Sequence, residues 1–479
     1  MQDAAHASLL RSSRQQLHAQ IAEALKVQSP ETKENQPELL AQHYAEAGLV
    51  ENSVVYWGKA GRRSAARSAM TEAAAQFQKG LDQLALLPDT PDRQRPELEL
   101  RSGLGAALMI VKGYAAPETG DNYARARELW EQLGSPSAFL QVPCGQLFYH
   151  VKPVRIRCGT LAEDLLRVSR QHNNIAGLVL GHTCSGRTLV PVGRFASARS
   201  HLEQVLALYD PIGHSSLPHQ VGIDPHVTSQ TNLALVLFCL GFPDQAMAQG
   251  SAAVTGARRL AHPPSLALSL GIGTYPLALA GDNLALEERV NELVSVAAEH
   301  GFSLYSAAGT ILRGWAMVKN GNVTEGMALL RSGSASYRAA GQEAWMPFFV
   351  GLQAAACEMA GRIEESLILS EEAFQIVERT GERWLEAELH RQKGQLLLQQ
   401  GHPAAAEELY RKALRIAREQ EAKLWELRAA VSLARLRRDQ GRHAEARELL
   451  APVYGWFTEG FATPDLREAK ALLDDLGGF

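Results

Sequence analysis

The sequence predicts an all-α fold, an α–α superhelix (solenoid) of helix–turn–helix repeats with a period of about 40 residues. Two rows of glycines carry that period, one falling halfway between the members of the other: Gly241, Gly281, Gly321, Gly361, Gly401 and Gly441, with Gly301, Gly341 and Gly381. Self-similarity at a fixed period of this size is typical of chains in which each repeat packs on its neighbours. The composition agrees, because 46% hydrophobic but only 6% aromatic residues suit Ala/Leu-rich helices better than strands.

The repeat is clearest on either side of Gly401. Residues 383–400 and 402–420 have helical spacing and strong helix formers, and Pro403 suits the first turn of a helix. Small residues and one aromatic recur at fixed distances from this turn: Gly394, Ala406, Tyr410 and Ala413. The spacing resembles the tetratricopeptide (TPR) motif, in which small residues let neighbouring helices approach closely. A period of 40 also falls in the range of HEAT and armadillo repeats, so the small residues decide for a TPR-like repeat.

Four segments are expected along the chain. Residues 1–28 form a short leading segment, 36–87 the first TPR-like repeats, 97–209 irregular repeats and 224–476 regular 40-residue repeats. Two further runs interrupt the pattern: 88–96, with three prolines, predicts a boundary, and 113–122 predicts an inserted loop.

The longest non-periodic run is 210–227. Gly241 follows Gly193 by 48 residues rather than 40, so the run is expected to be a surface loop with 8 extra residues. Long loops in repeat proteins are often functional, but the sequence does not give this one a role.

Composition limits the partners and the compartment. A net charge of −4 and a pI near 6.4 argue against direct nucleic-acid binding. Five scattered cysteines without a C-x-x-C pair suit a reducing cytoplasm, where neither a disulfide framework nor a zinc site is expected. The uncharged run 260–281 contains prolines and keeps the 40-residue register, so a buried helix pair is favoured over a membrane span.

Two runs could carry chemistry. Residues 181–188 (GHTCSGRT) nearly spell a phosphate-binding loop, but Gly186 is the small residue seven positions before the turn at Gly193, which places the run inside a helix. The 210–227 loop holds possible metal ligands, yet no pair has i, i+4 spacing, and a polar surface loop is favoured: His214, His219, Asp224 and His226. We therefore assign no catalytic, cofactor-binding or metal-binding residue, and expect no enzymatic activity from this chain.

Arginines gather on the last regular repeats. Counting back from Gly401 and Gly441 places one set of side chains on the concave side of the stack: Glu388, Arg391, Gln395, Arg428, Arg435 and Arg438. Such a patch could receive an acidic peptide or a C-terminal carboxylate through Arg forks. The hypothesis is that Arg391 and Arg435 hold an acidic segment of a protein partner. A solvated helix face balanced by Glu426 and Asp439 is the simpler interpretation.

The repeating tryptophans have a structural interpretation as well. Trp345, Trp384 and Trp425 each lie a few residues into the first helix of a repeat. Because the position recurs with the architecture, core packing is favoured over ligand stacking.

Several phrases resemble one bacterial family. They include QDAAHASLLRSSRQQLHAQIAEAL (2–25), QPELLAQHYAEAGL (36–49), LPDTPDR (87–93), KGYAAPE (112–118), LALYDP (206–211), TGERWLEAELHRQKGQLLLQQ (380–400), ELRAAVSLARL (426–436) and LLAPVYGWFTEGF (449–461). They are similar to the C-terminal TPR region of large predicted STAND-type ATPases, many with a class III adenylate cyclase domain in front. The middle departs from the family, with Pro153 and Gly159 where it has a plain helix turn.

The resemblance implies an arrangement of cyclase, ATPase with winged helix, and then this repeat region. The opening is similar to the end of the winged helix, with His6 at a position where the family usually has an aromatic, so the chain is expected to start partway through a domain. The ATPase phosphate loop and the cyclase metal carboxylates are absent from these 479 residues.

The leading expectation is a cytoplasmic, non-catalytic scaffold or sensor that binds a protein or peptide and regulates an ATPase or cyclase module. The alternatives are an adenylate cyclase or ATPase-family protein whose catalytic domains lie outside this chain, and a gene remnant without function.

Overall fold

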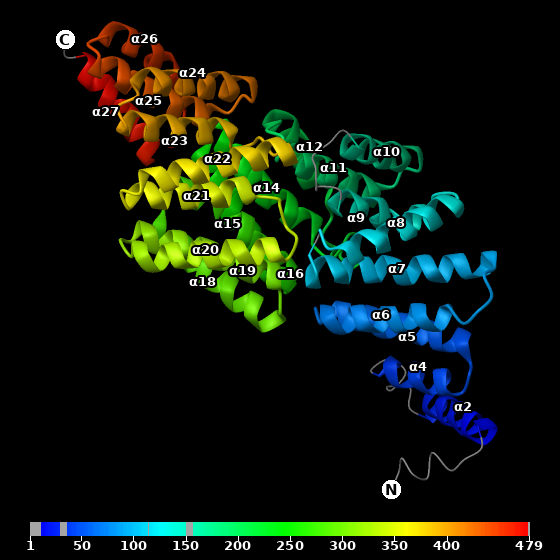
Figure 1. Cartoon of the computed structure of the whole chain (residues 1–479). Coiled ribbons are helices and arrows are strands. Elements are labelled where there is room, and N and C mark those ends of the chain that lie inside the picture. Colours follow the sequence, from blue (N-terminus) through cyan, green and yellow to red (C-terminus); the bar gives the residue numbers. More distant parts are fainter. Residues whose placement is uncertain (1–10, 29–35, 114, 150–156, 478–479) are drawn as a thin grey trace. The chain divides into compact units, whose positions relative to one another are not determined.

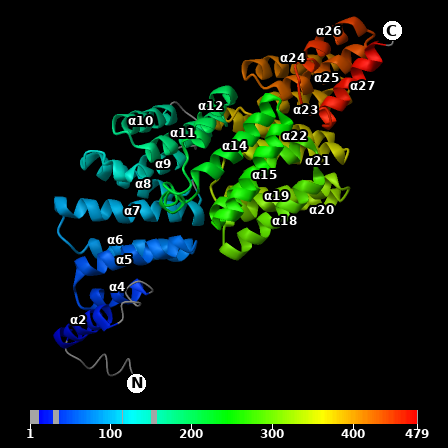
Figure 2. The same cartoon turned by 180° about the vertical axis from the view of Figure 1, so that it is seen from behind.

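A computed structural model describes residues 11–28, 36–113, 115–149 and 157–477, and every regular element among them is a helix. The predicted all-α fold of TPR-like helix pairs is therefore confirmed. The chain divides into two compact units (Figures 1 and 2). Unit 1 is residues 1–149 with 216–222, and unit 2 is residues 150–215 with 223–479. The expected leading segment falls partly outside the described residues, since description begins at Arg11.

Unit 1 is a stack of consecutive helices with one short insertion from later in the chain. Its elements are α2 (Arg11–Gln28), α4 (Pro37–Glu46), α5 (Val50–Ala66), α6 (Met70–Leu84), α7 (Pro91–Val111), α8 (Pro117–Gln132), the 3₁₀ turn η1 (Ser137–Phe139), α9 (Gln141–Tyr149) and α13 (Leu217–Val221).

Unit 2 carries the regular repeats. Its helices are α10 (Arg157–Gln171), α11 (Ile175–Leu189), α12 (Phe195–Leu208), α14 (Pro225–Leu240), α15 (Pro243–Leu260), α16 (Pro263–Ile272), α17 (Tyr275–Ala280), α18 (Asn283–His300), α19 (Ser303–Lys319), α20 (Val323–Ala339), α21 (Met346–Met359), α22 (Ile363–Thr380), α23 (Glu386–Gln399), α24 (Pro403–Glu419), α25 (Lys423–Asp439), α26 (His443–Tyr454) and α27 (Pro464–Gly477).

The glycines of the 40-residue period end helices. All nine have a positive φ, between 68° and 93°, which glycine adopts without the steric strain that a Cβ would cause. At Gly401 the turn links α23 to α24, and Pro403 stands in the first turn of α24 as expected.

The predicted small residues lie where helices of a pair approach. A Cβ on Gly394 would lie 2.7 Å from the Tyr410 ring, so the two positions fit one another only with glycine in the first helix. In the repeats that turn at Gly48 and Gly361, a serine stands five residues after the glycine, where Ala406 follows Gly401, and it hydrogen-bonds across the pair. Ser53 Oγ donates to the Ala41 carbonyl (2.9 Å), and Ser366 Oγ donates to the Ala354 carbonyl (2.7 Å). This cross-helix packing confirms the TPR-like interpretation of the spacing.

Two expectations about irregular segments were wrong. Residues 113–122 are not an inserted loop, because α8 begins at Pro117, whose missing N–H costs nothing in a first turn. Residues 210–227 are not simply a polar surface loop either. Their middle forms α13, which contacts α5, α7 and α9 and buries Leu217 and Val221. The chain returns to unit 1 at this point because Leu217 and Val221 bury their side chains against its helices.

Unit 2 closes on itself. The first turn of α15 is capped from far along the chain: the Glu459 carboxylate accepts from the N–H groups of Asp244 (2.9 Å) and Gln245 (3.1 Å). In return, the Gly460 N–H donates to the Asp244 carboxylate (3.0 Å). Helix α14 packs against α25 in the same region, with Phe238 edge-on to Trp425. Repeats about 200 residues apart therefore touch, as they would after one full turn of the superhelix.

The interior of unit 2 is consequently filled rather than hollow. Helix α14 is buried on nearly every side. Its second half is uniformly apolar, and Thr228, Thr231 and Asn232 in its first half satisfy their polar groups by donating to backbone carbonyls one turn back. Trp384 and Trp425 are 0% and 1% exposed, and the Trp425 indole donates to the Trp384 carbonyl (3.1 Å). Trp345, a third member of the repeating tryptophans, contacts Trp384 edge-on. Trp384 and Trp425 belong to the core, as expected, whereas Trp345 is half-buried. Only Trp425 lies inside its helix, since Trp345 and Trp384 precede α21 and α23.

Candidate functional site

The arginines singled out by the sequence lie on two helices of unit 2. Arg391 and Gln395 are on α23, and Arg428, Arg435 and Arg438 are on α25. Arg391, Arg428 and Arg435 line one cavity of about 140 Å³, together with Ser432, Asp465, Glu468 and the apolar side chains of Leu427 and Val431. The structure thus brings three of the six predicted residues together, while Glu388, Gln395 and Arg438 lie outside the cavity lining.

The two inner arginines are bound to carboxylates. Arg391 makes a bidentate pair with Glu388 (2.8 and 2.9 Å), and Arg428 makes one with Asp465 (2.7 and 2.9 Å). Arg428 also donates to Glu388 (3.4 Å) and to the Leu279 carbonyl of α17 (2.6 Å). These side chains are only 22% and 14% exposed, so the inner half of the cavity is a neutralised network within the closed interior.

The network fixes the charge state of its members. Burial alone would raise the pKa of Glu388, but the two arginines hold it below its usual value. Burial alone would lower the pKa of Arg428, yet Asp465 and Glu388 raise it. Both groups therefore stay ionised at neutral pH. Removing Glu388 would leave Arg391 without its carboxylate, and removing Arg428 would leave Asp465 without its arginine, each a largely buried charge.

The outer arginines are more accessible. The Arg435 side chain is 47% exposed and pairs with Glu468, which is itself 42% exposed. Arg438 donates to Asp439 (2.9 Å) and Asp475 (3.0 Å) at the surface. Asp439 was expected to balance this face and does so, whereas Glu426 pairs with Arg418 and Lys423 instead.

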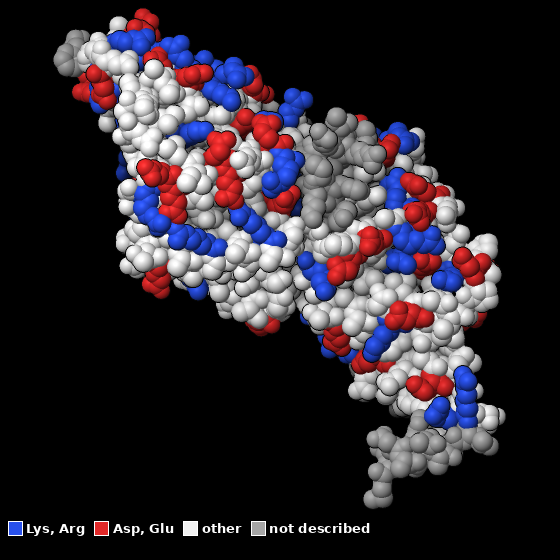
Figure 3. Space-filling view, in the orientation of Figure 1, with Lys and Arg blue, Asp and Glu red and all other residues white. Residues whose placement is uncertain are grey.

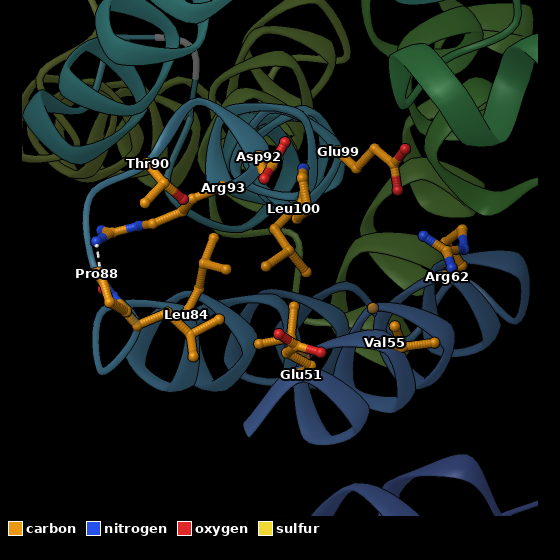
Figure 4. Close-up of a pocket in the computed structure, with 14 residues that line it drawn as sticks. Glu51, Val55, Arg62, Leu84, Pro88, Thr90, Asp92, Arg93, Glu99 and Leu100 are labelled. Atoms are coloured by element: carbon orange, nitrogen blue, oxygen red, sulfur yellow. Dashed lines mark hydrogen bonds between the residues drawn. The ribbon is translucent and has the colours of Figure 1, made fainter. Parts of the chain in front are cut away.

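Unit 1 contains a second candidate, a cavity of about 530 Å³ between α5, the end of α6 and α7 (Figure 4). Val55, Leu84 and Leu100 form its apolar wall. Pro88, Thr90 and Arg93 stand at one end in this view, and Arg62 and Glu99 at the other.

A further cavity of about 400 Å³ borders the same helices. Its apolar wall includes Met70, Phe77 and Ala106, and the exposed side of α13 contributes Ser216, His219 and Gln220. Arg62 and Glu99 line both cavities. We call the two together the unit 1 groove.

The sequence did not identify the unit 1 groove, although it contained a signal. Two runs that break the repeat pattern, 88–96 and 210–227, both supply lining residues. An irregular segment flanked by regular repeats was therefore the available indication of a concave surface, but nothing in the residue types distinguished it from an ordinary loop.

The two runs that could carry chemistry, 181–188 and 210–227, form neither a phosphate-binding loop nor a metal site within the described residues. Residues 181–188 lie inside α11, as expected, so their amide groups are engaged in the helix rather than arranged as a phosphate-binding loop. In the 210–227 run, Asp224 caps α14 by accepting from the Val227 N–H (2.7 Å) and binds the Tyr209 hydroxyl (2.6 Å). Within the described residues, no three His, Cys, Asp or Glu side chains gather in a way that could hold a metal ion.

The surface charges and the uncharged run add two findings. Basic and acidic side chains are interspersed on the face shown in Figure 3. Residues 260–281 form the short helices α16 and α17 of unit 2, as the register predicted. Over the part of the chain that the structure describes, no helix combines the length and the apolar character needed to span a membrane.

Comparison with known sequences supports the repeat assignment. Residues 350–419, which include Arg391 and Gln395, match the family described as tetratricopeptide repeat. The chain therefore contains a TPR region. An uncharacterized protein of Rhizobium meliloti (strain 1021) is 26% identical over 441 residues, which is 91% of this chain but 43% of that protein. The chain thus spans less than half the length of this curated relative.

Solved structures similar to this chain include three of low sequence identity. A Rap protein complexed with competence and sporulation factor has a TM-score of 0.49 at 11% identity, covering 77% of this chain and 98% of its own. Cut9 in the APC/C hetero-tetramer Cut9–Hcn1 has a TM-score of 0.39 at 13% identity (97% and 94% covered). Yeast Tom70 has a TM-score of 0.37 at 12% identity (96% and 96% covered).

Proposed function

We propose that this chain is a non-catalytic TPR scaffold or sensor that binds a protein or peptide partner and regulates an ATPase or cyclase signalling module. The observation that carries the proposal is the TPR region itself. Its buried side chains pack the helices together, and its exposed side chains form a continuous surface. Repeat stacks of this kind serve mainly as binding surfaces.

The partner contact that we propose in unit 2 is an acidic segment held by the arginine cluster, with Arg435 as the entry point. Exposed ion pairs contribute only about 0–1 kcal/mol, so a partner carboxylate can replace Glu468 at Arg435 with little loss. Arg391 and Arg428, which are already paired with Glu388 and Asp465, would line the inner wall of the cavity beneath the partner, and Gln395 and Arg438 would lie beside it.

Capture of partners from an extract of the source cells tests this site. We expect the immobilised wild-type chain to retain a partner that the Arg435→Glu variant and the Arg391→Glu/Arg435→Glu variant lose. The matched control is Arg411→Glu/Arg415→Glu on α24, where both arginines are exposed and pair within their own helix. Because Arg391→Glu places a second carboxylate beside Glu388, circular dichroism must show that the double variant is folded. Equal capture by wild type and the Arg435→Glu variant would falsify the role of this cluster.

The link to an ATPase or cyclase rests on the family resemblance and on the greater length of the Rhizobium relative. Under this proposal the chain itself does not bind nucleotide. Isothermal titration with ATP is expected to show no heat of binding, and a measurable affinity would favour the alternative of an ATPase-family activity in the chain. A cooperative thermal transition is expected of an intact stack, whereas a decayed gene remnant should unfold early and broadly.

A further inference from the structure

The unit 1 groove has the dimensions of a peptide site. Its lining follows α5 from Glu51 to Ala65, which at the rise of an α-helix is about 21 Å. An extended chain covers that distance with about six residues. Sharing of Arg62 and Glu99 joins the two cavities end to end, so an elongated ligand suits the groove better than a compact one.

The groove continues an interface that already holds a peptide segment of this chain. Helix α13 rests on α5, α7 and α9 through its buried side chains, and Gly222 ends it so close to α7 that a Cβ would lie 3.2 Å from the Ala106 carbonyl. Residues 216–222 contain no Asp, Glu, Lys or Arg. The surface next to α13 therefore accepts short apolar segments, and the adjoining cavity has Met70 and Phe77, which are 4% and 1% exposed, in its wall.

Charge sets the other requirement. Arg62 stands at the junction of the two cavities, and among the described residues it has no hydrogen-bond or ion-pair partner. At the far end, Arg93 donates to the Leu87 carbonyl (3.1 Å), but its buried Nε has no acceptor. Glu51, Asp92 and Glu99 also line the groove, so a strongly acidic ligand would meet repulsion.

We propose that the unit 1 groove binds a linear peptide segment of a protein partner, with one acidic residue paired to Arg62 and apolar residues on both sides of it. The apolar residues fill the two cavities on either side of Arg62. This inference rests on the proposed function as a partner-binding scaffold, but it assigns a surface separate from the arginine cluster on α23 and α25.

The test is selection of random dodecapeptides displayed on phage against the full chain. The best peptide is then synthesised with a fluorescein label, and its affinity is measured by fluorescence anisotropy. We expect an acidic residue flanked by apolar residues in the selected sequences. Arg62→Glu and Val55→Asp should each weaken binding by at least about tenfold, because the first reverses the paired charge and the second places a charge on the apolar wall.

Matched controls come from unit 2. Ile368→Asp changes a residue that is 69% exposed, against 52% for Val55, and Arg411→Glu reverses an arginine on α24 that is 59% exposed. Both controls should leave the affinity unchanged. Replacing the acidic residue of the peptide by arginine should abolish binding to wild type and restore it to the Arg62→Glu variant.

Three outcomes overturn the inference. They are selection of no peptide, binding that is indifferent to Arg62→Glu, and binding that is lost in Arg435→Glu instead. The last outcome would move the peptide to the arginine cluster and so support the proposed function while removing the groove from it. Failure of the capture experiment at Arg435 alone would leave the groove as the site of binding.

Discussion

Unit 1 and unit 2 are built from the same kind of helix pair, yet the helices fill the interior of unit 2 and border cavities in unit 1. In unit 2 the regular 40-residue repeats complete a turn, and the side chains of α14, α23 and α25 fill the interior. In unit 1 the repeats are irregular, and α5 and α7 border cavities of about 530 and 400 Å³. Strict repetition here leads to a closed interior, and departures from repetition leave an accessible groove.

The difference teaches where to look for binding in such a chain. A regular spacing of turn glycines indicates packing, because a repeat that stacks without variation buries the same positions each time. The concave side of a regular stack is not automatically a binding groove, since a stack that closes on itself consumes that side. The arginines of α23 and α25 show the effect, as the two inner ones are bound within the network.

The largest expected change in the free energy of unfolding comes from a substitution in the closed interior of unit 2. Trp384→Ala should lower the free energy of unfolding by about 3–5 kcal/mol, because a fully buried aromatic is removed and a cavity remains. Urea unfolding followed by circular dichroism measures it. The control is Trp456→Ala at a position 38% exposed, which should cost clearly less. Equal losses at the two tryptophans would contradict a filled interior.

A smaller effect should depend on pH. Burial raises the pKa of Glu382 to about 7, even though the Trp345 N–H and the Trp384 indole donate to its carboxylate. The folded state therefore keeps a proton that the unfolded state releases near pH 4.5, so this group stabilises the fold at low pH and loses that contribution as pH rises toward 7. The gap between these pKa values corresponds to about 3 kcal/mol.

Glu382→Gln isolates that contribution, because the amide stays neutral throughout. The stability of the variant relative to wild type should rise between pH 4.5 and 7 and level off above it. Chemical unfolding across this range measures the difference. A constant difference between the two proteins would show that Glu382 titrates normally.

The contact that closes the superhelix of unit 2 should contribute about 1 kcal/mol. Glu459→Ala removes the acceptor for two N–H groups in the first turn of α15, which is the usual effect of losing a helix cap. Glu448→Ala, at an exposed glutamate of α26, is the control and should change stability little. If both variants unfold at the same denaturant concentration as wild type, the two ends of the turn are not coupled through this cap.

The smallest effect on stability should come from the unit 1 groove. Val55→Asp should shift the unfolding free energy by no more than about 0.5 kcal/mol, because the side chain is 52% exposed and packs no core. Leu427→Asp, at a fully buried position of α25, provides the contrast and should unfold the protein or nearly so. Thermal unfolding of the pair compares an open face with a closed one directly.

Much of the fold could be predicted from the sequence, because helix ends and close helix approaches need glycine and other small residues at fixed positions. The turn at Gly401 and the contact of Gly394 with Tyr410 follow from that requirement alone. The closure of unit 2 could not be predicted, since it depends on the superhelical twist summed over several repeats. Arg428 has two such partners, Asp465 and the Leu279 carbonyl, and only that twist brings them together.

The candidate sites were less accessible to prediction. The arginines of α23 and α25 were identified by their side of the helix, and so was Glu388. Asp439 was named as a balancing charge, but the partners Asp465, Glu468 and Asp475 were not. Of the two cavities in the unit 1 groove, the one of about 400 Å³ depends on where α13 returns to the stack. A single turn of helix with three buried residues leaves no periodic signal in the sequence.

The position of α13 also limits how this gene can be cut. Residues 216–222 complete unit 1, although the chain on both sides of them belongs to unit 2. A truncation after residue 149 would therefore expose the surface of α5, α7 and α9 that α13 covers. A fragment starting at residue 150 would contain residues 216–222 without the helices on which they pack. Recombination at a single crossover could not exchange one unit and keep the other whole, so the two are expected to be inherited together.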